Sequence, residues 1–145
     1  MRAAIVHDPI DPTALTAEVA SSANGAIILF VGTVRETNEG RMVSGIEYAA
    51  YESMAIRELE AIAADAASRF GTGDVVVEHR IGRLALGETS VAIAVAHPHR
   101  AQAYEASRFI IEEIKRRVPI WKREEYIDGT REWIDPTARR AEVAT

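Results

Sequence analysis

Two stretches of the sequence are apolar over most of their length, and they constrain the fold more than any other feature. "NGAIILFVGTV" (24–34) is apolar at consecutive positions, which is typical of a strand buried on both faces. "TSVAIAVAH" (89–97) alternates large Val and Ile side chains with alanines, so one face is bulky and the other lets a helix pack closely. The sequence therefore predicts a buried central strand at 24–34 and a second strand at 89–97.

Helical patterns precede, separate and follow these strands. Apolar side chains recur at steps of three and four residues over 53–70 and over 100–118, which predicts two long amphipathic helices. Gly71 is placed to end the first, and Pro119 biases its preceding residue away from helix and ends the second. A shorter helix is expected in "DPTALTAEVASS", with Asp11 as its cap and Pro12 at its first position.

The remaining segments indicate further strands. They are expected at 2–7, 44–51, 74–82 and in a closing pair, "WKREEYI" and "REWI", around the turn at Asp128-Gly129. The segment 35–43 is predicted to be a mobile, turn-like loop. Because strands and helices are mixed without strict βαβ alternation, we expect an α+β fold, with residues 1–145 forming a single domain.

Composition excludes several classes of function. The formal charge of −5 argues against non-specific nucleic-acid binding, which requires an extended basic face. The chain has no cysteine, so it has neither a disulfide nor a thiol nucleophile. Its start lacks the apolar core of a signal peptide, and its apolar runs are too short for a membrane span. We therefore expect a cytoplasmic protein with no metal and no cofactor, since no metal-ligand spacing, GxGxxG or P-loop is present.

One basic cluster interrupts this acidic chain, in "EIKRRVPIWKREEY" (113–126). Lys115 and Lys122 are the only lysines, and the other fifteen cationic side chains are arginine. Cations complement the carboxyl end of a helix, but that argument does not reach Lys122, which lies beyond Pro119. Lysine differs from arginine in that its pKa falls when water is excluded, a property that proton transfer requires. The cluster indicates a small anionic ligand and a chemical role for lysine.

Two other segments place polar residues at the ends of apolar elements. In "GTVR", Arg35 directly follows the strand 24–34, and in "HPHR" His99 and Arg100 open the second long helix. A helix amino terminus favours anions, so Arg100 fits there if a phosphate or carboxylate lies beside it. His79 shares a face with apolar strand residues and is interpreted as structural.

Together these motifs resemble the family of large, catalytic subunits of molybdopterin synthase. The resemblance covers about residues 24–135 and depends on "GTVR", "HRIG" followed by "LGE", "HPHR" and "K…VPIWKRE" in that order. It leaves Arg139 and Arg140 without an assigned role. By motif match it implies catalytic roles for Lys115 and Lys122, and substrate contacts from Thr33, Val34, Arg35, His99, Arg100, Lys115, Lys122, Arg123 and Glu124.

The resemblance also implies an α/β hammerhead-type fold, with a mixed, mostly antiparallel sheet and two long helices. It implies a homodimer within a heterotetramer, carrying small ubiquitin-like subunits whose C-terminal Gly-Gly thiocarboxylate donates sulfur. The acceptor would be cyclic pyranopterin monophosphate, which becomes the dithiolene of molybdopterin, so the chain would be a sulfurtransferase of molybdenum cofactor biosynthesis. In this reading Lys115 moves a proton, Lys122 holds the acyl end or the pterin, and Arg35, His99 and Arg100 bind the phosphate.

Helix length adds a constraint on the site. Fifteen residues separate Arg100 from Lys115, which is roughly 22 Å along a continuous helix. One compact site is therefore not expected to use both ends of one helix. We expect either an elongated ligand or, in preference, a site shared between two copies across a two-fold axis.

Two non-catalytic interpretations remain open from the residues alone. The chain could be a regulatory module that binds an anionic phosphometabolite, or an adaptor that docks the acidic tail of a partner. Both need cations but not lysine in particular, so both tolerate Lys→Arg changes. The adaptor would in addition bind with a steep salt dependence and without turnover.

Overall fold

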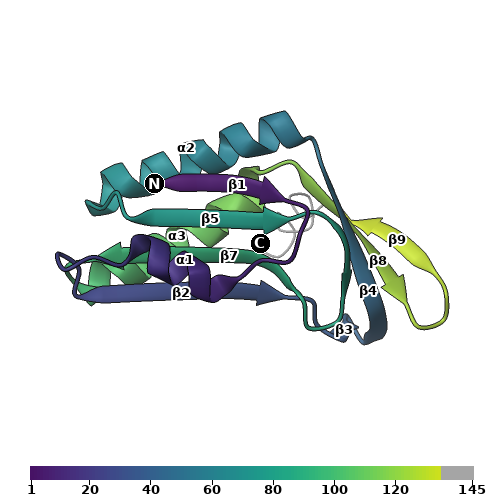
Figure 1. Cartoon of the computed structure of the whole chain (residues 1–145). Helices are drawn as coiled ribbons and strands as arrows, with labels where there is room; N and C mark the ends of the chain where they lie inside the picture. Colours follow the sequence, from purple (N-terminus) through teal and green to yellow (C-terminus); the bar gives the residue numbers. More distant parts are fainter. Residues whose placement is uncertain (135–145) are drawn as a thin grey trace.

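The structure, a computed structural model, describes residues 1–134, so Arg139 and Arg140 lie outside the described residues. Over this range the chain forms two sheets and three helices, the α+β architecture expected (Figure 1). One sheet carries the helices on its two faces, and the other extends from its end. The candidate site lies where the two sheets meet.

The first sheet has the strand order β1-β5-β7-β2, in which β1 and β5 are parallel and the other pairs antiparallel. The expected strand 24–34 is β2, but the prediction that it is central and buried is wrong. It is an edge strand, and Ile27, Leu29 and Val31 on one of its faces are 42%, 38% and 36% exposed. A continuous apolar run does not reveal how many neighbours a strand has. The strands are β1 (Arg2–Val6), β2 (Ala26–Thr33), β5 (Val75–Arg80) and β7 (Thr89–His97).

Helix α1 (Pro12–Val19) covers the alanine face of β7, as its small side chains predict. Asp11 caps it, since its Oδ1 accepts hydrogen bonds from the N–H groups of Thr13 and Ala14. Figure 1 shows α1 in front of the first sheet and α3 behind it, and α2 packs with α3 in the core on that second face. The small alanine side chains of β7 therefore allow α1 to pack close to this strand.

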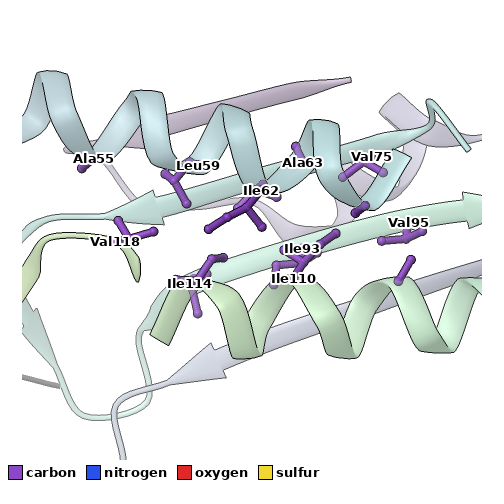
Figure 2. Close-up of a cluster of buried hydrophobic side chains, with 14 of the residues drawn as sticks. Ala55, Leu59, Ile62, Ala63, Val75, Ile93, Val95, Ile110, Ile114 and Val118 are labelled. Carbon is purple, nitrogen blue, oxygen red and sulfur yellow. The ribbon is translucent and has the colours of Figure 1, made fainter. Parts of the chain in front are cut away.

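The large side chains of β7 point to the opposite face, where α2 (Glu52–Phe70) and α3 (Arg100–Arg117) form the main core with β5 and β7. Figure 2 shows Ile93 between the two helices. Gly71 ends α2 in a left-handed conformation, with φ 73°. The core includes Ala55, Leu59, Ile62, Ala63, Val75, Ile93, Val95, Ile110, Ile114 and Val118.

The second sheet has five strands and contains the closing pair predicted from sequence. The segment 35–43 is not an irregular loop but a β-hairpin, because Glu39 and Gly40 take positive φ values of 51° and 78° and let β3 pair with β4. Strand β6 was not predicted. The strands are β3 (Thr37–Asn38), β4 (Arg41–Ala50), β6 (Gly82–Ala85), β8 (Ile120–Tyr126) and β9 (Arg131–Ile134).

Among the helices of residues 1–134, none has both the length and the apolar character that a bilayer crossing requires.

Candidate active site

A pocket of about 210 Å³ lies between the end of β2, the β3–β4 hairpin, β8 and the last turns of α3. A smaller cavity of about 30 Å³ involves some of the same side chains and extends to His79. Polar groups from four separate segments therefore meet at one place. The charged or amide side chains that line the larger pocket are Arg35, Asn38, Lys115, Lys122 and Glu124.

Both lysines line both cavities. Lys115 stands in the last turn of α3, and Pro119 stops the helix so that the chain returns as β8. In β8 alternate residues face the same side, so Lys122 and Glu124 share the pocket side while Arg123 faces away. The six residues between the two lysines thus reverse the direction of the chain and bring both lysine side chains to one pocket.

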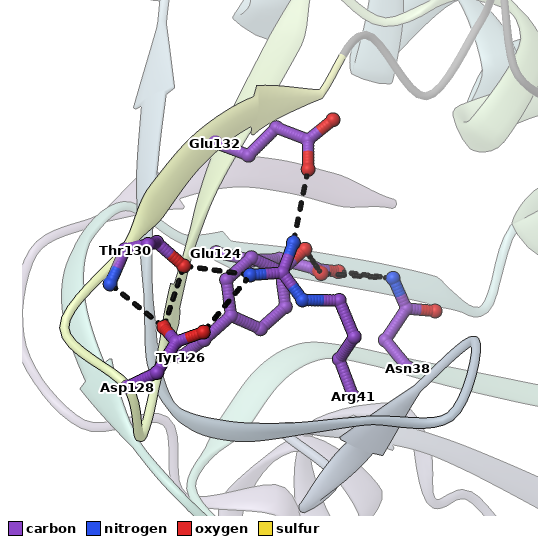
Figure 3. A network of polar contacts seen from close by, with 7 residues as sticks. All are labelled: Asn38, Arg41, Glu124, Tyr126, Asp128, Thr130 and Glu132. Atoms are coloured by element: carbon purple, nitrogen blue, oxygen red, sulfur yellow. Dashed lines mark hydrogen bonds and ion pairs between the residues drawn. The ribbon is translucent and has the colours of Figure 1, made fainter.

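Glu124 is the most enclosed charged group of the site, with 1% of its surface exposed. Its carboxylate accepts hydrogen bonds from Asn38 Nδ2 at 2.9 and 2.8 Å and from the Tyr126 hydroxyl at 2.7 Å (Figure 3). Lys122 Nζ lies 3.3 Å from Glu124 Oε1. Burial acts to raise the pKa of Glu124, but the hydrogen bonds from Tyr126 and Asn38 and the charge of Lys122 outweigh it and hold the pKa below its ordinary value. Glu124 is therefore a carboxylate that orients Lys122.

The "GTVR" segment contributes unequally to the pocket. Thr33 and Arg35 line it, whereas the Val34 side chain is 3% exposed and packs in the core of the second sheet. The main chain of Val34 bonds to the turn before β7, donating to Glu88 O and accepting from Gly87 N. Val34 thus fixes the position of its neighbours.

His99, Arg100 and Arg123 do not line the pocket in a single copy of the chain. His99 and Arg100 lie at the opposite end of α3, as its length predicts. Arg123 donates to Glu47 at 2.8 Å, and its guanidinium lies 5.3 Å from the centre of the Trp133 ring. The substrate roles expected for these three residues stay predictions.

Sequence reasoning missed three residues at the site. Asn38 lies in the segment 35–43, which was interpreted as a turn-like loop, Tyr48 was not singled out, and His79 was interpreted as structural. His79 is indeed buried, but it lines the smaller cavity beside both lysines, with its ring 5.3 Å from that of Tyr48. Desolvation lowers the pKa of His79 to about 4, so its imidazole is neutral. Tyr48 lies opposite Lys122 through the register of β4 and β8, which no local pattern in the sequence indicates.

The fold and pocket define a class of protein: a two-sheet α+β fold with a pocket at the sheet junction that two lysines and an arginine line. The sequence model of the family described as "MoaE protein" matches residues 5–117, and the chain belongs to this family.

Individual relatives agree with this membership. A protein of Neosartorya fischeri named molybdopterin synthase catalytic subunit is 40% identical over 95% of this chain and 73% of its own length. The crystal structure of molybdopterin synthase from Staphylococcus aureus superposes with a TM-score of 0.84 at 35% identity, covering 90% of this chain and 95% of that one. A complex of subunits 1 and 2 of the molybdopterin-converting factor of Helicobacter pylori shares the fold at 24% identity, with a TM-score of 0.72, and covers 90% and 88%.

Proposed function

We propose that this chain is the catalytic subunit of a molybdopterin synthase and acts as a sulfurtransferase. Sulfur passes from the C-terminal Gly-Gly thiocarboxylate of a small ubiquitin-like subunit to cyclic pyranopterin monophosphate and forms the dithiolene. The convergence of the only two lysines on one pocket carries this proposal. Membership of the MoaE family, whose relatives bear the name molybdopterin synthase catalytic subunit, supports it.

The chemistry of the reactants fits the charges of this pocket. The chain has no cysteine, so its sulfur has to arrive on another molecule. A thiocarboxylate and a phosphate ester are both anions, and Lys115, Lys122 and Arg35 supply positive charge around one pocket. When the donor loses its sulfur, its acyl carbon has to gain an oxygen from water, so protons have to be moved as bonds change.

The two lysines have different surroundings and therefore different proposed roles. Lys122 is held beside the Glu124 carboxylate at 3.3 Å, which suits a fixed charge that binds the acyl end of the donor or the pterin. Lys115 stands on a different element, in the last turn of α3, and lines the smaller cavity together with the neutral His79, and it is assigned proton transfer and stabilisation of developing charge. Arg35 is assigned the phosphate.

A homodimer would bring the remaining predicted residues to this site. Within residues 1–134, strand β2 has no neighbour on one edge and a partly exposed apolar face, the features of a strand that pairs with another copy. Antiparallel pairing about a two-fold axis at its middle sets Ala26 of one copy beside Thr33 of the other. Because Ala26 pairs with His97 in its own sheet, the "HPHR" segment of one copy would then approach the pocket of its partner.

Reconstitution tests the proposed activity. The purified chain is mixed with a thiocarboxylated small subunit and cyclic pyranopterin monophosphate, and dithiolene product is measured. Product should form with the natural chain, and Lys115→Arg, which keeps the charge, should reduce turnover by at least about 100-fold because the proton-transfer group is lost. The surface variant Arg108→Lys is the matched control and should be fully active. Near-normal turnover of Lys115→Arg would remove the assigned role, and no product from the natural chain would remove the proposed function.

A further inference from the structure

Asn38, in the short strand β3, connects two sides of the pocket through a single amide. Its Nδ2 lies 2.9 and 2.8 Å from the two oxygens of Glu124. Its Oδ1 accepts a hydrogen bond from Arg35 Nη2 at 3.4 Å. The amide nitrogen thus binds the Glu124 carboxylate, and the amide oxygen binds the guanidinium of Arg35.

Tyr126 holds the same carboxylate from within β8. Its hydroxyl donates to Glu124 Oε2 at 2.7 Å, and its ring is covered by the guanidinium of Arg41, 3.4 Å from the ring centre (Figure 3). Arg41 is in turn fixed by Thr130 Oγ1 at 2.6 Å and by ion pairs to Asp128 and Glu132. The phenol therefore has little freedom to rotate away from Glu124.

We infer that Asn38 and Tyr126 are positioning residues of this site: together they hold Glu124 as a carboxylate whose charge fixes the Lys122 ammonium at the pocket wall, and Asn38 also orients Arg35. The effect on turnover that this inference expects rests on the proposed function. The inference changes the role expected for Glu124 from substrate contact to support of Lys122. Neither positioning residue is assigned a contact with the reacting atoms.

The charges around Glu124 show why the two donors are needed. Lys122, on the same strand, favours the ionised form of Glu124. Glu132 on β9 pairs with Glu124 in the strand register and forms an ion pair with Arg41. The β3–β4 hairpin contributes Asn38, whose amide also binds Arg35. The phenol of Tyr48 on β4 and the ammonium of Lys115 on α3 complete the lining. A carboxyl group that is 1% exposed protonates readily once its hydrogen-bond donors are removed, and a neutral carboxyl no longer attracts Lys122.

The test removes the donors one at a time. Tyr126→Phe deletes one hydroxyl without changing the shape of the ring, and Asn38→Ala deletes the amide. The Glu124 carboxyl is titrated by carbon NMR in the isolated, isotope-labelled chain, and turnover is measured as a function of pH. We expect the Glu124 pKa to rise in both variants, kcat/KM to fall by about 10- to 100-fold, and the acid limb of the pH profile to move to higher pH.

A third variant separates positioning from packing. Asn38→Asp keeps the size of the side chain but sets a second carboxylate against Glu124, so it should impair activity at least as much as Asn38→Ala. Asn24→Ala and Tyr104→Phe, which lie outside the pocket, are the matched controls and should leave the Glu124 titration unchanged. A Glu124 pKa that does not move in folded Tyr126→Phe and Asn38→Ala overturns the inference. Because the NMR titration needs no substrate, that result stands apart from any failure of the proposed reaction.

Discussion

At the scale of single residues, Glu124 and His79 are both buried, yet Glu124 is charged and His79 is neutral, because the two side chains have different neighbours. Glu124 is nearly inaccessible to water, yet three donors keep it ionised. His79 is also buried but has a single backbone partner, Arg80 O at 2.9 Å from Nδ1, and the positive charge of Lys115 nearby. Its neutral tautomer donates from Nδ1. A buried ionisable group keeps its charge only where the fold supplies enough partners.

His79 gives the chain a pH-dependent stability whose sign can be stated. Desolvation lowers the pKa of His79 to about 4 in the folded state, whereas the unfolded chain binds this proton near pH 6.5. Between these values the unfolded state holds more protons, so the free energy of unfolding falls as pH decreases from 6.5 to 4, by at most about 3 kcal/mol from this group. Urea unfolding at pH 7.5 and pH 5 should show the loss, and His79→Leu should show a smaller difference between the two pH values. An unchanged difference in His79→Leu would assign the effect to other groups.

At the scale of elements, two neighbouring strands of similar composition meet different environments. Strand β7 lies between β5 and β2 with both faces covered, and its Ala92, Ala94 and Ala96 admit α1. Strand β2 carries larger side chains on the corresponding face and stays partly open. The pattern of small and large residues on β7 correctly predicted a close helix. The apolar run of β2 did not predict that this strand lies at the edge of the sheet, because the number of neighbours of a strand depends on how all the strands of the sheet pair.

The packing of α1 on β7 can be tested by enlarging one alanine. Ala94 is fully buried beneath this helix, so Ala94→Leu has no space for three added carbons and should lower the free energy of unfolding by about 1–3 kcal/mol. Ala17→Leu, on the exposed side of α1, is the matched control and should change it by less than about 0.5 kcal/mol. Both values come from urea denaturation. Equal effects would show that α1 does not rest closely on this strand.

At the scale of the whole molecule, the described chain places its predicted anion-binding residues at two separated points. Lys115 and Lys122 meet at the sheet junction, while His99 and Arg100 lie at the other end of α3. One copy thus holds an incomplete set of the substrate contacts that the family resemblance implies. In the proposed two-fold dimer through β2, each pocket would receive the "HPHR" segment of its partner, and residues 1–145 are proposed to form a single domain.

Mixed dimers test whether the site is shared. Lys115→Ala and Arg100→Ala are each expected to be inactive alone. If each pocket takes Lys115 from one copy and Arg100 from the other, a mixed dimer contains one intact pocket and one doubly defective pocket, so it should recover about half of the natural turnover. Lys115→Ala mixed with Lys122→Ala is the matched control, because both changes affect the same copy's contribution and no intact pocket forms. The absence of rescue in the first mixture, with mixed dimers shown to be present, would contradict sharing.

The sequence alone determined the local structure and the chemical character of this protein. Interactions within a few residues determine the helix periodicity, the caps at Asp11 and Gly71 and the helix end before Pro119. These features could therefore be predicted without a structure. The family motifs and the two lysines likewise pointed to one anion site.

Only the tertiary structure decided which residues share that site. It set β2 at an edge, turned 35–43 into a hairpin whose Asn38 reaches Glu124 across 86 positions of sequence, and faced Arg123 away from the pocket. Strand order and register depend on contacts among segments far apart in the chain, and no local pattern encodes them.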